Sequence, residues 1–285
     1  MSVDGNVNIV LSHTPRWQPA SVTVASDSPQ MDLILDFLLQ PISGAAEHHI
    51  SHAHRWHARF MTLAWGVLIP CGILIARYFK VTPRQNWPRQ LDSQFWWISH
   101  LALQIGGCLL SLVALAHVFG SASSGGSLAS IHGILGWSIS LLALTQLVGG
   151  ALRGTAGHRQ VVLDAELRAM IGSGDHYLMT LRRCVFEYAH KLSGYSALVL
   201  SMVNILLGLT ISDAPRWMWL LIVGFWLALA ALAMVLQRQG RCIDTYQAIY
   251  GPDPELPGNR RPPIGWGVRR YDADEWPAAR CSRRA

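Results

Sequence analysis

Five long apolar segments constrain this chain more than any other feature of its sequence. Each is long enough, at about 1.5 Å of rise per helical residue, to cross the ~30 Å hydrocarbon core of a bilayer. The sequence therefore predicts an all-α fold, an integral membrane helical bundle with five transmembrane helices. The segments cover residues 56–79, 95–119, 128–152, 188–211 and 217–236.

The composition favours a membrane protein and argues against a soluble enzyme. Hydrophobic residues make up 51% of the 285 residues and charged residues only 14%, whereas about 25% of the residues in soluble proteins are charged. A net charge of +6 would suggest nucleic acid as the partner of a soluble protein, but arginines that flank membrane helices explain it here. We therefore expect membrane lipid as a partner and no nucleic acid.

Lysine and arginine are distributed unequally between the two sides of the predicted bundle. They are concentrated in the connections after the first, third and fifth segments. Because positively charged connections stay in the cytoplasm, we expect the N-terminus outside and the C-terminus in the cytoplasm. Three regions follow: an N-terminal extracytoplasmic leader over residues 1–55, a transmembrane domain over 56–236, and a mostly disordered cytoplasmic tail over 237–285.

The shorter stretches between and before the segments allow further predictions. Residues 121–126 are few and rich in Gly and Ser, so the second and third helices should be adjacent and antiparallel. Residues 153–187 show loose helical spacing and can form a small helical cap. The apolar run 31–42 is too short to span a membrane and is either a short interfacial helix or part of a disordered leader.

Histidine is unusually frequent, with 12 residues beside only two lysines. Ionisable side chains inside membrane helices are costly, so each is a candidate for function. Four of them lie near the starts of four successive segments: His57, His100, His132 and His190. Because successive helices run antiparallel, His57 and His132 fall at the outer face, and His100 and His190 fall at the inner face. The sequence thus predicts two histidine pairs, one in each leaflet.

A histidine pair across a helical bundle can hold an iron porphyrin, because one imidazole ligates each face of the ring. Glycine follows two of the histidines after one helical turn, at Gly136 and Gly194, and the missing side chain leaves room for a flat macrocycle. The same glycines could instead serve close helix packing. The chain has no Cys-x-x-Cys-His motif for covalent attachment of haem.

The surroundings of these histidines resemble the cytochrome b561 family. Residues 57–72 and 76–78 are similar to the first haem-bearing helix of that family, in the form that other members attach to an extracellular β-sandwich domain. We expect no such domain within this chain. The following three helices resemble those of the family through His100 with Gln104, Gly106 and Gly107, through His132 to Gly136, and through His190 to Tyr195 with Asn204 and Gly208.

The resemblance implies a transmembrane electron carrier with two haem b groups, each bound by two histidines: His57 with His132, and His100 with His190. Electrons would pass from a small-molecule or protein donor on one side to an acceptor on the other. The usual donor of the family is ascorbate and its acceptors are monodehydroascorbate or ferric chelates, which implies an ascorbate-dependent or ferric-reductase type of oxidoreductase. Family members commonly have six helices, whereas five segments are found here. A homodimer is one option for the assembly.

Three basic residues lie at the predicted inner ends of the helices: Arg77, Lys80 and Arg153. Arginine forms bidentate contacts with carboxylates, so these side chains could bind haem propionates or an anionic donor. They could equally anchor the helices at the membrane edge.

Two other functions compete with this interpretation. A quinol-coupled cytochrome b could anchor a partner redox protein, and a transporter could use histidines to relay protons or to bind a transition metal. No Asp or Glu lies at the middle of the five segments, which disfavours a cation pathway. His117 is a competitor for the outer pair, although it lies 17 residues after His100 and so about 100° off the helix face that carries His100. The histidines of residues 48–54 form either an outer metal site or a solvated loop, because their spacing is irregular and no carboxylate partner completes a site.

Overall fold

The structure is a computed structural model, and it describes residues 29–42, 50–120, 126–159, 172–272 and 275. Within these residues, five helical spans are long and apolar enough to cross a membrane, which confirms the predicted all-α membrane bundle. The spans are His52–Tyr78, Gln94–Val118, Ser127–Ala151, Leu181–Ile211 and Arg216–Arg238. The helical spacing predicted in the 153–187 connection rests mostly on residues 160–171, which lie outside the described residues.

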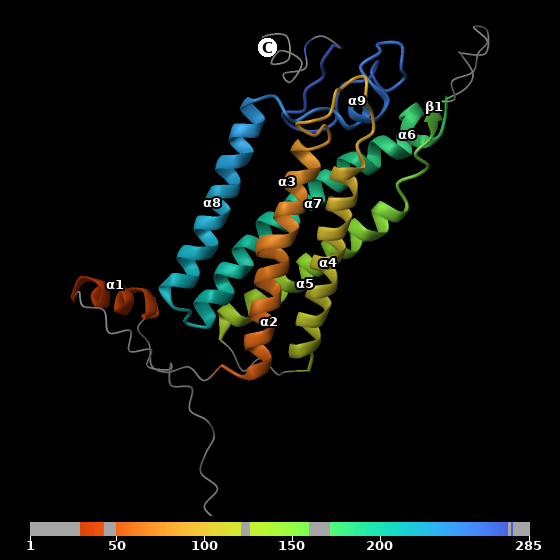
Figure 1. Cartoon of the computed structure of the whole chain (residues 1–285). Coiled ribbons are helices and arrows are strands. Elements are labelled where there is room, and N and C mark those ends of the chain that lie inside the picture. Colours follow the sequence, from red (N-terminus) through yellow and green to blue (C-terminus); the bar gives the residue numbers. More distant parts are fainter. Residues whose placement is uncertain (1–28, 43–49, 121–125, 160–171, 273–274, 276–285) are drawn as a thin grey trace, which may run out of the picture.

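The first span is built from three consecutive helical pieces, and short elements lie outside the spans (Figure 1). A pair of two-residue antiparallel strands also lies outside them. The elements are α1 (Pro29–Leu39), α2 (His52–Leu63), η1 (Ala64–Leu68), α3 (Ile69–Tyr78), α4 (Gln94–Val118), α5 (Ser127–Ala151), β1 (His158–Arg159), β2 (Gly172–Ser173), α6 (Asp175–Leu178), α7 (Leu181–Ile211), α8 (Arg216–Arg238) and α9 (Thr245–Tyr250).

A proline explains why the first span is not one regular α-helix. Pro70 has no N–H to donate to the carbonyl of Gly66 four residues earlier, and the π-helical turn η1 precedes it. The indole Nε1 of Trp226 on α8 donates a hydrogen bond to this Gly66 oxygen over 2.9 Å. A Cβ added at Gly66 would lie 2.9 Å from Cδ1 of Ile222. The irregular turn therefore supplies a close contact between the first span and α8.

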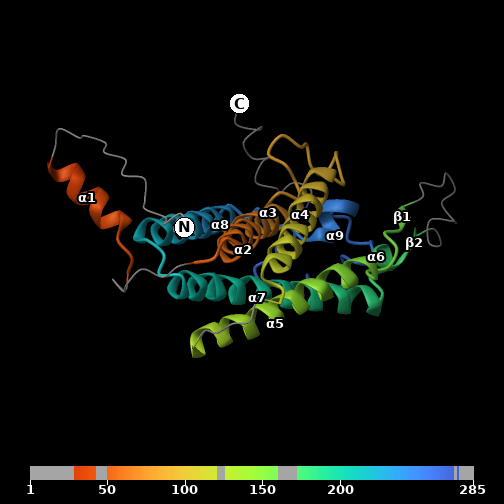
Figure 2. The ribbon, with the colours of Figure 1, turned by 90° about the horizontal axis from the view of Figure 1, so that it is seen from below.

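The spans form two layers, which are best seen along the bundle (Figure 2). The α4 layer consists of α8, the first span and α4, and the α5 layer consists of α5 and α7. We predicted α4 and α5 as neighbours, but α4 packs mainly on the first span and α5 packs mainly on α7. Buried apolar side chains from both layers form the membrane core: Ala64, Trp65, Ile69, Ile139, Ala197, Ile205, Ile222 and Trp226.

Helix α1 lies beside the bundle, next to the start of α8, and extends away from the spans (Figure 1). This end of the bundle carries the start of α2 with His57, and we call it the His57 end. Arg216, at the start of α8, donates a hydrogen bond to the Phe37 carbonyl of α1 over 3.2 Å. The same guanidinium lies 4.4 Å from the centroid of the Phe37 ring. Of the two alternatives for residues 31–42, the structure thus shows a short helix.

A folded cap covers the opposite end of the bundle, the His100 end (Figure 1). The described part of the cap consists of residues 79–93, 153–159, 172–180 and 239–272. Its core includes Val81, Trp87, Ile243 and Tyr246, whose exposed fractions are 2% or less. The sequence predicted a mostly disordered tail over residues 237–285, and the packing of residues 239–272 corrects this prediction.

This part of the tail is ordered because its charged groups have partners within the cap. Asp244 accepts a hydrogen bond from the backbone N–H of Tyr246 and so caps α9, and it also pairs with Arg270 across 2.6 Å. Arg270 donates further hydrogen bonds to the carbonyl oxygens of Gly258 and Asn259. The prolines and charges that predicted disorder therefore lie in loops that pack around α9.

Replacing Trp226 with Phe should lower the stability of the bundle. The substitution removes the indole donor and leaves the Gly66 carbonyl without that partner, which should cost about 1–3 kcal/mol. Thermal unfolding of the protein in detergent should therefore show a lower midpoint for W226F than for the wild type. Trp217→Phe, at a site with 40% exposure, is the control. An unchanged midpoint for W226F would contradict the role given to this hydrogen bond.

Candidate functional site

The four histidines from successive spans lie together in two pairs. The ring centroids of His57 and His132 are 6.2 Å apart, and those of His100 and His190 are 6.4 Å apart. His57 on α2 and His100 on α4 belong to the α4 layer, whereas His132 on α5 and His190 on α7 belong to the α5 layer. Each pair therefore faces across the boundary between the two layers, and the pairs lie at opposite ends of the bundle.

The spacing within each pair fits two imidazoles that share one metal ion. A metal–nitrogen bond of about 2 Å on each side, with about 1.2 Å from each nitrogen to its ring centroid, separates the centroids by about 6.4 Å. Both observed separations, 6.2 and 6.4 Å, agree with this value. The donor set of two neutral nitrogen ligands also suits haem iron.

Hydrogen bonds orient three of the four rings. The Nδ1 atoms of His57, His100 and His132 each lie 3.1 Å from a backbone carbonyl oxygen. A carbonyl can only accept, so each Nδ1 carries the proton and each Nε2 keeps its lone pair for a metal. The accepting residues are Ala114, Gly72 and Asn204, respectively.

The fourth ring is held differently. His190 Nδ1 has no hydrogen-bond partner among the described residues. The ring instead packs on Phe186, with 5.1 Å between the centroids. Aromatic packing, rather than a carbonyl acceptor, therefore limits the orientation of this imidazole.

Two glycines near the histidines, Gly136 and Gly194, lie at positions where the surrounding side chains would also accommodate a larger residue. A Cβ added at Gly136 would lie 3.6 Å from the nearest side chain, and one at Gly194 would lie 3.4 Å away, both ordinary contact distances. Close helix packing therefore does not account for these two glycines, whereas a flat cofactor would. At Gly208 an added Cβ would lie 3.2 Å from Cε1 of His132, so this glycine makes room for the His132 ring itself.

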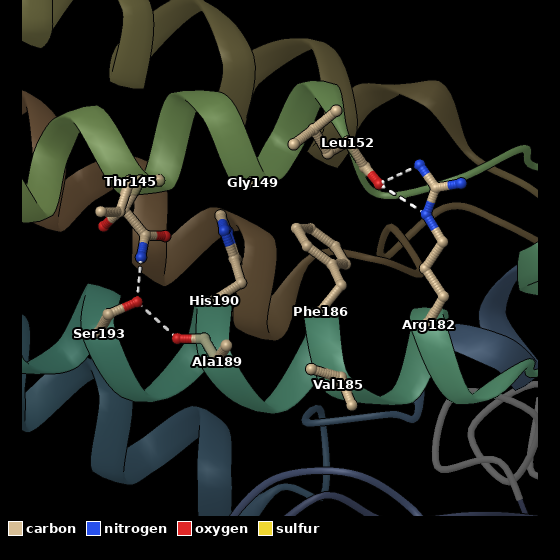
Figure 3. Close-up of a pocket in the computed structure, with 10 residues that line it drawn as sticks. Thr145, Gly149, Leu152, Arg182, Val185, Phe186, Ala189, His190 and Ser193 are labelled. Carbon is tan, nitrogen blue, oxygen red and sulfur yellow. Dashed lines mark hydrogen bonds between the residues drawn. The ribbon is translucent and has the colours of Figure 1, made fainter.

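A cavity of about 340 Å³ lies between α5 and α7 beside His190. In Figure 3, His190 and Phe186 extend from α7 towards the segment of α5 that carries Gly149. The volume lies in the range of about 300–1,000 Å³ that is typical of ligand and cofactor sites. The lining residues are Thr145, Gln146, Gly149, Leu152, Arg182, Val185, Phe186, Ala189, His190 and Ser193.

Two of the three predicted basic residues are engaged by the tail at the His100 end. Arg77 donates hydrogen bonds to the Tyr195 hydroxyl over 3.0 Å and to the Trp266 carbonyl over 2.6 Å. Lys80 is buried and donates to the Ile243 carbonyl over 2.9 Å. Burial lowers the pKa of Lys80 to about 8. The tail thus supplies backbone partners for side chains that the sequence suggested for an anionic group.

The third basic residue, Arg153, lies near the start of α4. Its guanidinium carbon is 4.0 Å from the centroid of the Trp97 ring. Trp97 lies on α4 about one helical turn before His100. Burial lowers the pKa of Arg153. All three predicted basic residues are therefore at the His100 end.

Sequence reasoning missed a cluster of charged residues around Glu187 on α7. Its carboxylate lies 3.1 Å from Arg183 and 2.9 Å from Lys191. The i, i+4 spacing of these residues was the available signal. The imidazole of His176 on α6 lies 3.7 Å from the same carboxylate, and burial, followed by the charge of Arg183, lowers the pKa of His176 to about 3.

Two further histidines within the described residues, His117 and His52, have partners outside both pairs. His117 Nδ1 lies 2.8 Å from the Val113 carbonyl, and its ring packs on Phe60. His52 accepts a hydrogen bond from Trp56. Among the described residues, no group of three His, Cys, Asp or Glu side chains could hold a metal ion. His48 and His49 lie outside these residues.

The fold and this geometry define a class: a helical membrane protein with two histidine pairs, one at each end of the bundle. Residues 56–157 match the family described as eukaryotic cytochrome b561. The chain therefore contains a cytochrome b561 domain, as the histidine contexts suggested. No solved structure matches the chain with significance.

Three relatives illustrate the similarity. A cytochrome b561, DM13 and DOMON domain-containing protein of Arabidopsis thaliana is 32% identical over 54% of this chain and 14% of its own length. A second Arabidopsis protein, with cytochrome b561 and DOMON domains, is 25% identical over 77% of this chain and 47% of its own length. A Danio rerio protein named "Putative ferric-chelate reductase 1" is 27% identical over 64% of this chain and 27% of its own length. The chain thus spans less than half of each relative.

The stability of the cap should fall as the pH decreases below 6.5. The pKa of His176 is about 3 in the folded state, against 6.5 for the free side chain, so between these values the unfolded state binds the extra proton. Within this window, each decrease of one pH unit should lower the free energy of unfolding by up to about 1.4 kcal/mol. Near-ultraviolet circular dichroism of the cap tyrosines during thermal unfolding at pH 7, 6 and 5 measures this loss.

His176→Phe is the matched variant, because it keeps an aromatic ring against Tyr246 and Tyr250 and removes the titrating group. Its unfolding midpoint should depend less on pH than that of the wild type. If the two proteins lose stability equally between pH 7 and pH 5, the buried imidazole is not the cause.

Proposed function

We propose that this protein carries electrons across a membrane through two b-type haems, one held by His57 with His132 and the other by His100 with His190. The observation that supports this proposal most strongly is that both pairs have the spacing of two ligands on one metal. The cytochrome b561 domain implies the same general activity.

Each haem, when bound, would supply reversible one-electron oxidation and reduction of its iron. With a histidine on both faces, neither iron would have an open position for a substrate. The residues of the chain would therefore act by holding and orienting the rings. The carbonyl partners of His57, His100 and His132 fix the tautomer in which Nε2 is the ligand.

Helix α4 gives the separation of the two sites. His100 lies on this helix, and the carbonyl of Ala114 that accepts from His57 lies on it as well. These residues are 14 positions apart in the sequence, about 21 Å along a helix axis. The two pairs would thus fall in opposite leaflets of a bilayer with a ~30 Å core. Trp65, buried on the first span, lies between the two levels.

The His57 end would face outwards and the capped His100 end would face the cytoplasm. The distribution of Arg and Lys supports this orientation, and Arg77, Lys80 and Arg153 all lie at the capped end. We infer that electrons enter there from a donor of the ascorbate type. The name of the Danio rerio relative supports a ferric chelate as the acceptor at the His57 end, which would make the protein a transmembrane oxidoreductase.

Spectroscopy of the purified protein tests the haem assignment directly. The reduced-minus-oxidised spectrum should show a b-type α band, and haem extraction should yield about two haems per chain. His57→Ala and His100→Ala should each remove about half of the haem, because each breaks one pair. His117→Ala, whose ring lies outside both pairs, is the control and should retain both haems.

The possible failures of this experiment are distinct. A wild-type protein without the α band would exclude the haem proposal altogether. Full haem content in both H57A and H100A, with the band present, would show that other residues are the ligands.

A further inference from the structure

A buried ion cluster of Arg183, Glu187 and Lys191 lies on α7, on both sides of His190 in the sequence. The Glu187 carboxylate contacts Arg183 Nε at 3.1 Å and Lys191 Nζ at 2.9 Å. The Glu187 side chain is 7% exposed and that of Arg183 is 10% exposed. Buried charges are costly unless they are paired, so the three side chains depend on one another.

The cluster is in contact with the surroundings of His190. Glu187 is three residues before His190 on the same helix, and side chains at this spacing are neighbours. The Arg183 guanidinium lies 5.3 Å from the centroid of the Phe186 ring, and Phe186 packs on His190. The cluster is therefore placed to act on whatever His190 binds.

The charges that face Glu187 can be counted from the elements packed around it. Arg183 and Lys191 on α7 are cationic, and His176 on α6 is neutral at neutral pH, as its lowered pKa requires. From the described part of the tail, the Ile264 carbonyl accepts a hydrogen bond from Lys191 over 2.8 Å. Lys80, which follows α3, also interacts electrostatically with Glu187 and Lys191. Glu187 thus offsets one of the two positive charges that are in direct contact with its carboxylate.

We propose that Glu187 is a positioning residue that sets the midpoint potential of the haem at His100 and His190. Its carboxylate holds Arg183 and Lys191 in place and offsets part of their charge. The oxidised iron carries one more positive charge than the reduced iron, so a nearby negative charge favours oxidation and a nearby positive charge favours reduction. This inference rests on the proposed two-haem function.

A redox titration of the purified full-length protein, followed by the α bands, tests the inference. Glu187→Gln removes a negative charge and should shift the potential of the His100–His190 haem to a more positive value. Lys191→Gln removes a positive charge and should shift it to a more negative value. In the double variant Glu187→Gln/Lys191→Gln, the potential of the His100–His190 haem should be close to the wild-type value. The potential of the His57–His132 haem should stay unchanged in all variants.

Opposite shifts distinguish this role from a purely structural one, because loosened packing would lower the haem content or shift both variants in the same direction. Glu187→Asp, which retains the charge, should shift the potential least. Glu255→Gln is the matched control, since Glu255 pairs with Arg260 on the exposed surface of the cap, and neither potential should change. If E187Q does not retain haem, K191Q decides the question, because Lys191 is 30% exposed and tolerates substitution better.

The outcomes separate the two proposals. Unchanged potentials, or shifts of the same sign, in variants that keep both haems would overturn the role of Glu187 and leave the two-haem function intact. A wild-type protein without a b-type α band would overturn both.

Discussion

The hydrogen bond from an imidazole Nδ1 to a carbonyl on a neighbouring helix is the interaction on which the site depends. His57 bonds from α2 to α4, His100 from α4 to α3, and His132 from α5 to α7. Each bond stays within one layer and joins two of its helices. Because the bonded nitrogen faces its own layer, the other nitrogen is left for the opposite layer. The same contact therefore joins two helices of a layer and leaves the second imidazole nitrogen to face across the layer boundary, as the proposed haem ligation requires.

The sequence could predict the spans and the histidine pairs because both depend on local patterns. Hydrophobic length defines a membrane helix, and antiparallel succession places every second histidine at the same end. Which spans pack against each other was harder to predict from the sequence. A short connection joins α4 to α5, which suggested that they are neighbours, but it constrains only their ends. The preference of α5 for α7 depends on side-chain packing along the whole length, which no local pattern encodes.

The cap was missed for a related reason. Prolines and scattered charges predicted a disordered tail, yet Asp244 pairs with Arg270, 26 residues later, and Lys80 reaches the Ile243 carbonyl across 163 residues. Such pairings offset part of the cost of burying charge, but composition alone does not reveal them. Helix α7 likewise begins at Leu181 rather than near residue 188, and Arg183 and Glu187 form a buried ion pair in its first turns. The charged residues before position 188 suggested that the membrane segment starts after them, but they belong to the same helix.

The cap makes the two ends of the bundle electrostatically different. At the His100 end, Lys80 and Lys191 donate to backbone carbonyls of the tail, and Glu187 lies buried between Arg183 and Lys191. Low-dielectric surroundings strengthen the effect of these charges on a neighbouring group. At the His57 end, Arg59 and His54 are exposed, so solvent screens them. The two proposed haems would therefore differ in potential although both have two histidine ligands, and that difference would give electron transfer between them a preferred direction.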